Sequence, residues 1–589
     1  MSNNIFTNHF HTHVSKLFWN CIANNANTDY YMFAARNLDF PNDDVPPSPL
    51  TSYRAEHTEI HEEIVFGKKL SSNDVTFMIG NNLWESGTVY AQYDDQDETL
   101  HSKNFFSIVY LSDEYLIYKC LKNNNGGAST IKPTQKLTTS FVLSDGYEWK
   151  FMGSVTEDYY AKFSTNAFAP INPSSNDVVT VASSSVLGAI DSYIIIDGGI
   201  DYRAYATGTI KEPLVGGNTK KFYIQSEDYT LSANTDFYKN SSLYISSGNG
   251  SGQLRKIEGY GTEGNNRYVL LDEAFVSVPD ASSTFEIAPY VTIVGDGTGA
   301  VAKTVVNEID YSIEDIIVIQ RGEGYSWADI QIQSNTGISD SDTASVRAAI
   351  SPYGGHGSNI IDELYADAVG LSTKFEGSNH PIDNTFRKFG ILKNPRFNRL
   401  VITVNTATSF AAETSVSQPS SGASGDIVSV DTGNSTITLE NVFGIFATGS
   451  ENPIYGSDPD NTTYVTATDI DYSTFDARTI LDVVVTYNGS NNTGFLQNEK
   501  ITQINNDNAY GYVHEVNGNT IYVNPMKGEF YASGTDYIVG ETSGATATIT
   551  TYTKGQLVKG SGEFLYIENM QPITRAANQN ELMKIVVEF

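Results

Sequence analysis

Short runs of Val, Ile, Thr and Tyr, separated by clusters of Gly, Asn, Asp and Ser, recur along most of this 589-residue chain. Such runs are typical of β-strands, and the clusters between them are typical of tight turns. Many similar strands and turns favour small barrels or sandwiches. The sequence therefore predicts a mainly β fold of β-sandwich- or barrel-like modules with a few short helices.

The length and the composition predict several globular domains. A chain of 589 residues is too long for one ordinary hydrophobic core. In two ranges, aromatic-rich mixed sequence gives way to Ser, Thr, Gly, Asn and Asp that alternate with Val and Ile. We interpret these ranges, residues 173–351 and 406–553, as β-rich insertions. The remaining ranges, 1–172, 352–405 and 554–589, are predicted to form one discontinuous core domain.

Two segments carry the apolar period of a helix. The first is Thr12–Ala23, whose apolar face contains Val14, Leu17, Phe18 and Cys21. The second is Ser358–Val369, which starts with a plausible Ser358 cap. Its apolar stripe consists of Ile360, Ile361, Leu364 and Ala368. We predict that both are packing helices.

Two patterns recur within the chain. Residues 194–202 parallel residues 317–325, each an apolar run that enters a glycine turn and ends on tyrosine. A Gly-Asn pair separates alternating apolar runs at residues 433–434 and 518–519, with a looser copy at 264–265. Both residue types tolerate positive φ, so each pair predicts the turn of a β-hairpin. These copies favour modules built from similar hairpins.

The charge balance argues against contact with phosphate groups. Lys and Arg total 36 against 69 Asp and Glu, which gives a formal net charge of -33. Such a charge repels nucleic-acid backbones and anionic lipid surfaces, so we expect neither nucleic acid nor a membrane among the partners. A solvated acidic surface is the favoured interpretation, with a cationic partner or bound cations as the alternative.

Cysteine usage and hydropathy indicate a cytoplasmic site of synthesis. Cys21 and Cys120 are the only cysteines, too few for a disulfide-stapled scaffold. Met1–Phe10 contains no basic segment followed by an apolar one, and no stretch approaches the ~20 apolar residues of a membrane span. We expect a chain that folds in a reducing compartment and is neither anchored nor exported by a signal peptide.

The sequence singles out no active site. Gly295–Ala300 resembles a phosphate-binding loop, but the residues after it, Val301–Val306, predict a strand where a nucleotide loop would start a helix. A glycosidase needs two opposed carboxylates, and nothing distinguishes one pair among 69 acidic residues. We predict no catalytic residue, no cofactor and no enzymatic activity.

Two groups of side chains could hold a metal ion. His9, His11 and His13 alternate, so on a strand their rings would share one face. The helical pattern from Thr12 onward would scatter these rings, and we favour a solvated or partly packed cluster. Acidic groups could coordinate calcium but follow no calcium-loop spacing, and we favour solvated turns. These acidic residues are Asp94, Asp95, Asp97, Glu98, Asp458 and Asp460. No metal site is predicted.

Several separated segments occur in an order typical of one family. They are residues 30–36, 41–49, 116–121, 145–151, 386–395, 562–569, 572–573, 578–579 and 584–589. Through them the chain resembles the baseplate wedge subunit of T-even-like contractile-tailed phages, the gene-eight product family, enlarged by the two insertions. The closest match is the C-terminal one, from Gly562 to Phe589. The matched parts cover somewhat under half of the chain, and their order carries the resemblance.

The resemblance implies a non-enzymatic structural protein of the virion. Members of the family are homodimers within each of six wedges around the tail hub, where they contact other baseplate wedge proteins. They contribute to baseplate assembly and help to transmit the trigger for sheath contraction. No active site carries over, and the contacts would be large complementary surfaces.

A different class of function is the alternative. The 36 tyrosines of the chain could present aromatic platforms to cell-surface glycans, as in a carbohydrate- or receptor-binding tail appendage. Tyrosine is also common at ordinary protein interfaces, which favours the structural interpretation. A polysaccharide depolymerase is less favoured, because it requires a carboxylate pair that the sequence does not place.

Overall fold

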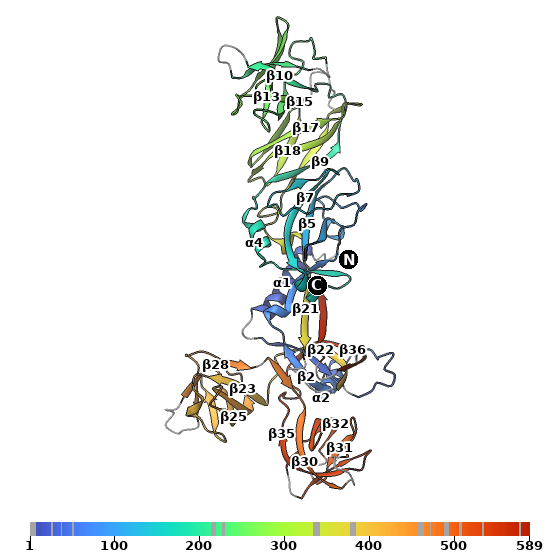
Figure 1. Ribbon diagram of the computed structural model, residues 1–589, viewed down its shortest axis with the longest axis vertical. Coiled ribbons are helices and arrows are strands. Elements are labelled where there is room, and N and C mark those ends of the chain that lie inside the picture. Colours follow the sequence, from blue (N-terminus) through green and yellow to red (C-terminus); the bar gives the residue numbers. More distant parts are fainter. Residues whose placement is uncertain are drawn as a thin grey trace, which may run out of the picture. The chain divides into compact units, whose positions relative to one another are not determined.

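The computed structural model describes residues 7–24, 28–36, 38–49, 52–213, 219–226, 230–333, 342–376, 384–456, 464–471, 473–487, 494–505, 509–532, 535–575 and 579–589. Strands account for 49% and helices for 10% of the chain, which confirms the predicted mainly β, multidomain fold (Figure 1). The chain divides into two compact units. Unit 1 comprises Met1–Ser15, Phe77–Ala368 and Phe589, and unit 2 comprises Lys16–Thr76 and Val369–Glu588.

An antiparallel sheet with an aromatic core forms the first part of unit 1. Its strands in spatial order are β4 (Phe106–Leu111), β5 (Glu114–Asn123), β7 (Tyr147–Thr156) and β6 (Phe141–Val142). Tyr118, Tyr147 and Trp149 are buried in one cluster, to which helix α4 (Asn176–Ser183) adds Val181. Three shorter elements complete this part, namely α3 (Glu157–Phe163), β8 (Phe168–Ile171) and the 3-10 turn Leu100–Ser102. β8 pairs with Phe77–Gly80 of β3 (Val75–Gly80).

Two further sheets of unit 1 share one apolar cluster and so form a small sandwich. The larger has the order β16 (Val291–Gly295), β19 (Ala328–Ile332), β20 (Ser345–Ile350), β9 (Ile190–Asp197). The smaller pairs β17 (Thr298–Val306) with β18 (Ile313–Glu323). The predicted parallel between residues 194–202 and 317–325 is visible here. Gly199 and Gly322 have φ of 61° and 64°, and Tyr202 and Tyr325 are buried in the shared cluster.

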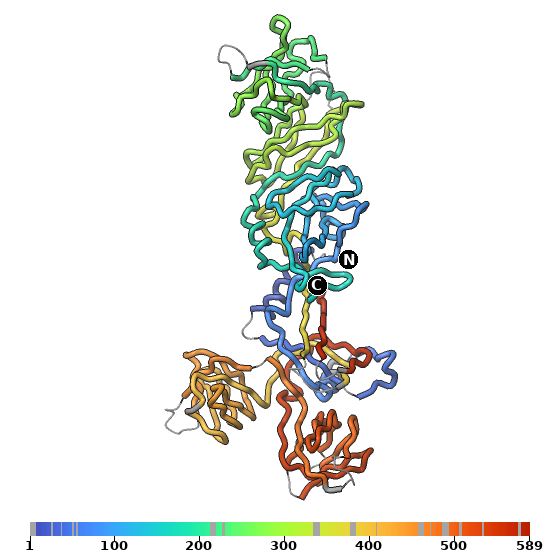
Figure 2. The backbone as a smooth tube through the Cα atoms, in the orientation of Figure 1, coloured from blue at the N-terminus to red at the C-terminus, as the bar shows by residue number. Residues whose placement is uncertain are grey.

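Sheet A lies at the centre of unit 2. Its spatial order is β29 (Thr474–Asp476), β2 (Ile64–Lys69), β1 (Tyr30–Ala35), β22 (Asn384–Lys393) and β36 (Glu563–Arg575). Strands from distant parts of the chain are thus neighbours, as the blue, yellow and red segments of Figure 2 illustrate. Every residue of β1 is buried. Helix α2 (Tyr53–Glu63) and the neighbouring strands β21 (Ala368–Phe375) and β37 (Glu581–Glu588) complete this part.

The structure contains three closed six-stranded barrels, each around its own apolar core. Barrel 1, in unit 1, consists of β10 (Ala206–Pro213), β11 (Lys221–Gln225), β12 (Ser241–Ser247), β13 (Leu254–Glu263), β14 (Asn266–Leu271) and β15 (Thr284–Pro289). Barrel 2, in unit 2, consists of β23 (Arg399–Val404), β24 (Ser415–Gln418), β25 (Ala423–Asp431), β26 (Thr436–Phe443), β27 (Pro453–Gly456) and β28 (Tyr464–Asp471). Barrel 3, also in unit 2, consists of β30 (Thr479–Tyr487), β31 (Lys500–Gln503), β32 (Tyr510–Asn517), β33 (Thr520–Lys527), β34 (Tyr537–Gly540) and β35 (Thr546–Thr553).

Barrels 2 and 3 have the same strand order around the ring. In both, the first strand pairs with the fourth and the sixth, and the second pairs with the third and the fifth. Barrel 1 has this same ring if β11 is counted first and β10 last. Its topology is therefore a circular permutation of the other two. The three barrels are versions of one module.

The predicted Gly-Asn hairpins occupy the same place in all three rings. They are β13–β14, β25–β26 and β32–β33. In two of them the glycine alone has positive φ, at Gly264 (60°) and Gly518 (59°). The connection in barrel 2 is longer, and there Ser435 rather than Gly433 or Asn434 has positive φ.

One predicted helix is confirmed and the other is largely wrong. Helix α1 covers Asn8–Ala23 and so includes the predicted segment. The segment predicted as a helix over 358–369 contains only α5 (Ile360–Glu363), whose cap is Asn359 rather than Ser358. Tyr365 then takes a φ of 51°, which no α-helix accommodates, and the chain enters β21. The residues of the apolar stripe belong instead to the short helix α5, to the turn after it and to the start of β21.

The predicted insertions can be compared with the strands. The range 173–351 contains barrel 1 and the sandwich strands, and the range 406–553 contains barrel 3. Barrel 2 begins earlier, at Arg399. No helix in the described part of the chain has the length and apolar character needed to cross a membrane.

Candidate functional site

The three alternating histidines lie on α1 rather than on a strand. His9 and His13 are one turn apart and exposed, whereas His11 is half-buried on another side of the helix. The shared face that a strand would have given them does not form. Across the described ranges, no group of three or more His, Cys, Asp or Glu side chains is placed to hold a metal ion.

The acidic turn at 94–98 is occupied by contacts within the protein. Arg347 forms ion pairs with Asp94 and, at 3.4 Å, with Asp95. Lys103 lies 2.6 Å from Asp97, and the amide of Thr99 donates to the same carboxylate. These pairs fasten a loop and leave no cage of free oxygens. Asp458 and Asp460 lie outside the described residues.

The glycine-rich segment 295–300 spans the turn between β16 and β17, and the residues after it form a strand, as predicted. Asp296 in this turn accepts hydrogen bonds from the amides of Ser326 and Trp327 and from the Ser326 hydroxyl. These bonds, led by that from the Ser326 hydroxyl, lower the pKa of Asp296 to about 2. The turn is thus held by its own carboxylate, and the strand after it offers no helix N-terminus to a phosphate.

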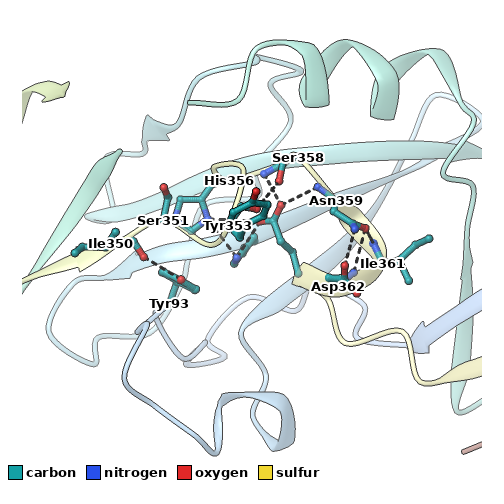
Figure 3. A network of polar contacts seen from close by, with 12 residues as sticks. Tyr93, Ile350, Ser351, Tyr353, His356, Ser358, Asn359, Ile361 and Asp362 are labelled. Atoms are coloured by element: carbon teal, nitrogen blue, oxygen red, sulfur yellow. Dashed lines mark hydrogen bonds and ion pairs between the residues drawn. The ribbon is translucent and has the colours of Figure 1, made fainter. Parts of the chain in front are cut away.

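A buried cluster of charged side chains lies inside unit 1, around the network in Figure 3. Lys119, in the interior of β5, is only 1% exposed. Its Nζ lies 3.1 Å from Oε2 of Glu363, 3.2 Å from Nδ1 of His356 and 4.1 Å from the centre of the Tyr93 ring. The ammonium therefore faces a carboxylate, an imidazole nitrogen and an aromatic face.

The turn before α5 positions the carboxylate of this cluster. Oε1 of Glu363 accepts hydrogen bonds from the amides of Gly357 at 2.7 Å and Asn359 at 3.3 Å. Gly357 has a φ of 91°, and a Cβ there would lie 2.4 Å from Val181. Only glycine meets both conditions without strain. The hydroxyl of Tyr93 donates to the carbonyl of Ile350 and ties the segment at its other end.

Burial and charge pairing set the protonation states of the cluster. Burial raises the pKa of Glu363, but Lys119 and His356 together outweigh this effect and the pKa falls to about 2. Burial lowers the pKa of Lys119, and the charge of Glu363 opposes that shift. The pKa of His356 is lowered by burial and by Lys119, so its ring is neutral and can accept the lysine's hydrogen bond. The result is an ion pair beside a neutral imidazole.

Unit 2 contains a second cluster of this kind. Lys388 of β22 lies 2.9 Å from Glu63 and 3.2 Å from Glu59, both on α2. Arg36, next to β1, also pairs with Glu63. Burial raises the pKa of Glu63, although Lys388 and Arg36 oppose the shift. The adjacent Arg387 has its own partners, with its Nη2 2.7 Å from Oδ2 of Asp43 and 2.5 Å from Oδ1 of Asp39.

These two clusters are suited to holding strands and turns together. Every cation in them faces a carboxylate of the same unit. The lysine and carboxylate of the unit 1 cluster are almost completely shielded from water, where a substrate could not reach them. This shielding favours a structural role for the unit 1 pair. That the chain has no catalytic residue stays a prediction.

No protein-family model matches the chain, and no curated protein matches it.

Sequence analysis missed both clusters although it quoted their strands. Lys119 interrupts the apolar run 116–121, and Arg387 and Lys388 interrupt the run 386–392. A basic residue inside a buried strand must find a buried or nearby anion. The interruption was thus a usable signal for a charge pair. The identity of the partner was not readable, because Glu363 is 244 residues away from Lys119.

A second missed feature is a glutamine that clamps one loop in each barrel. The carboxamide of Gln418 bonds both the N–H and the C=O of Ala447, and that of Gln503 does the same with Tyr531. Gln253 bonds the loop of barrel 1 through the amide of Val276 and the carbonyl of Ser277. In each case the clamped residue follows a buried phenylalanine. These are Phe275, Phe446 and Phe530.

Proposed function

We propose that this chain is a non-enzymatic structural subunit of a contractile phage tail baseplate, belonging to its wedge. In this role it forms a homodimer, contacts other wedge proteins and passes on the rearrangement that triggers contraction. The chain acts in the virion and is assembled in the host cytoplasm. Its function is carried by surfaces that fit partners, and by a scaffold that keeps those surfaces in place.

The observation that supports the proposal most is the composition of sheet A. Three of the separated segments that resemble the wedge family are residues 30–36, 386–395 and 562–569. They lie on β1, β22 and β36, which are consecutive neighbours in one sheet. Segments that pair in space are under a common packing constraint, which explains why their order and spacing would persist while insertions grow between them.

A second pair of matched segments behaves in the same way in unit 1. Residues 116–121 lie on β5 and residues 147–151 lie on β7, and the two strands pair over most of their length. Of the C-terminal match, Asn578 lies outside the described residues. The buried cations described above belong to these same matched strands.

The proposal is tested by mixing purified proteins. The molecular mass of the chain is measured by light scattering, first by itself and then after mixing with each wedge protein of the same phage. By itself, the chain should have twice the mass of one monomer. It should form a larger stable complex with at least one wedge protein. An unrelated protein of equal net charge serves as the control. A strict monomer that joins no tail protein contradicts the proposal.

The same preparation separates the alternative functions. Incubation with host surface polysaccharide is scored for binding and for the release of reducing ends. The wedge proposal expects neither. Binding without release would favour a carbohydrate-binding appendage, and release of reducing ends would favour a depolymerase.

A further inference from the structure

A cleft of about 320 Å³ lies between barrel 3 and the connecting segment 554–559 of unit 2. One wall is the end of β33 and the loop after it, from Pro525 to Phe530, and the other includes Tyr552 and Leu557. The volume is at the lower end of the range typical of ligand pockets, roughly 300–1,000 Å³. A site of this size accommodates a few side chains rather than a folded domain.

The charge of this cleft opposes that of the whole chain. Its lining includes three lysines, Lys527, Lys554 and Lys559, and one glutamate, Glu529. The chain carries nearly twice as many acidic as basic residues. A concentration of lysines in one small cleft is therefore a local departure from an acidic surface. The lysines of the cleft attract an anion, and a carboxylate finds few other basic sites on so acidic a chain.

One of these lysines is paired and another is not. Lys554 lies 2.9 Å from Glu529, whose side chain is 73% exposed. The exposed side chain of Lys527 has no hydrogen bond or ion pair with any residue that the structure describes. Glu529 thus places one carboxylate in the cleft and leaves an ammonium group beside it unused. An exposed pair of this kind contributes little stability and is readily exchanged.

Hydrogen bonds from buried side chains hold the wall that carries Lys527 and Glu529 in place. Gln503 is fully buried and clamps Tyr531 through two hydrogen bonds. Lys559 at the floor donates to the carbonyl oxygens of Glu62 and Pro525 and to Oδ1 of Asn524. Burial lowers the pKa of Lys559 to about 7, whereas the hydrogen bond with Glu529 raises that of Lys554. A wall that is already held in place reduces the entropic cost of binding.

We propose that this cleft binds an acidic segment of a partner protein, with carboxylates that pair with Lys527 and displace Glu529 from Lys554. Glu529 acts as an internal competitor for the incoming carboxylate. The aliphatic and aromatic lining, including Met526 and Tyr552, packs against the uncharged parts of the segment. The inference does not rest on the baseplate assignment, because it needs only the lining of the cleft.

Charge also favours a short acidic peptide over a long polyanion. A nucleic acid extends its charge far beyond a cleft of this size, onto a surface that is acidic overall. A protein segment can place two or three carboxylates in the cleft and be neutral or basic on either side. The corresponding cleft at barrel 2 lacks this selectivity, because its lining balances Lys69 and Arg396 against Asp29 and Asp469.

The test uses a fluorescein-labelled eight-residue peptide that alternates Glu with Gly, and the full chain. Binding is followed by fluorescence anisotropy at low salt. We expect saturable binding that weakens as salt rises. Lys527→Gln and Lys554→Gln should each weaken it by about tenfold, the size of a charge-assisted hydrogen bond. Glu529→Gln should instead tighten it by about threefold, because the competing carboxylate is removed.

Lys500→Gln is the matched control. Lys500 is a half-buried lysine on the same barrel that lies outside this lining and has Glu541 at 3.9 Å. Its replacement makes the same change in net charge and should leave the affinity unchanged. Far-ultraviolet circular dichroism checks that each variant is folded.

Four outcomes overturn the inference. They are no binding by the unaltered chain, equal binding of a peptide with Gln in place of Glu, the same loss in Lys500→Gln as in Lys527→Gln, and weaker binding in Glu529→Gln. Two phosphate probes complete the test. An oligothymidylate or inorganic tripolyphosphate that binds more tightly than the peptide, and responds to the same variants, would replace the proposal with a phosphate site.

Discussion

Unit 1 and unit 2 both bury basic residues inside strands, but they distribute the opposing charge differently. In unit 1, Lys119 has one carboxylate, Glu363, and both side chains are at most 2% exposed. In unit 2, Lys388 and its neighbours share several carboxylates, among which Glu59 is 40% and Asp39 is 76% exposed. Among the described residues, the enclosed cluster offers Lys119 no second ion pair. The distributed cluster has substitutes and access to water, so it should tolerate the loss of one member.

The largest effect is expected from Glu363→Gln. The change removes the carboxylate that pairs with Lys119 and leaves only the more distant charge of Asp191 to oppose the buried ammonium, which costs about 3–5 kcal/mol of unfolding free energy. Hydrogen exchange of β5 and α5 measures the loss within unit 1. The double variant Lys119→Met with Glu363→Leu removes both charges and should recover most of it. If the double variant is as unstable as the single one, charge is not the cause.

A pH effect of about 3 kcal/mol is expected in unit 2 from His61 of α2. Its two ring nitrogens are buried without a hydrogen-bond partner among the described residues, and its ring lies 4.4 Å from that of His57. Burial, followed by the charges of His57 and Lys559, lowers the pKa of His61 to about 4. The folded pKa is thus below the unfolded value, so the unfolded state takes up the proton first. Stability should fall as pH drops from about 6.5 to about 4.

The contribution of His61 is obtained as the difference between two proteins, because carboxylates titrate in the same pH range. Unfolding free energies of the unaltered chain and of His61→Phe are measured at several pH values. Their difference should change by the stated amount between about pH 6.5 and 4 and remain constant above that range. A difference that is independent of pH would contradict the assignment to His61.

A smaller effect is expected from Lys388→Met in unit 2. Glu63 then keeps Arg36 as a partner and Glu59 remains partly in water, so the expected cost is about 2 kcal/mol, less than the full cost of breaking a buried pair. The loss of unfolding free energy is measured by hydrogen exchange of peptides from sheet A at increasing denaturant concentration. A loss equal to that of Glu363→Gln would remove the distinction between the two clusters.

The sequence predicted the β class, the hairpin positions and helix α1, because these depend on local periodicity and turn residues. It could not predict that residues 30–36, 386–395 and 562–569 meet in sheet A, because strand order leaves no trace in periodicity. The helix predicted at 358–369 failed for a related reason. Its Glu363 is held by Lys119 and by the Gly357 turn, and this tertiary constraint overrides a local apolar stripe.

For the candidate sites, too, the sequence predicted local features but not tertiary ones. The local pattern predicted that a helix would scatter His9, His11 and His13. The clusters around Lys119 and Lys388 combine residues hundreds of positions apart, and only the interruption of an apolar run by a basic residue indicated them in advance. The charged residues of the lysine cleft beside barrel 3 lie close together in the sequence, but which of them share a cleft depends on how the strands fold.

The smallest effect is expected from the glutamines that clamp one loop in each of the three barrels. Gln418→Leu and Gln503→Leu remove the two hydrogen bonds to the half-buried Ala447 and Tyr531 and should each cost about 1–2 kcal/mol. Gln253 is half-buried and lies after its strand rather than on it, so Gln253→Leu should cost less. Gln225→Leu, at an exposed glutamine of barrel 1, is the control and should remain within about 0.5 kcal/mol. If Gln253→Leu equals the other two, the clamp is independent of the permutation, and the module tolerates a change of its chain ends without loss of this contact.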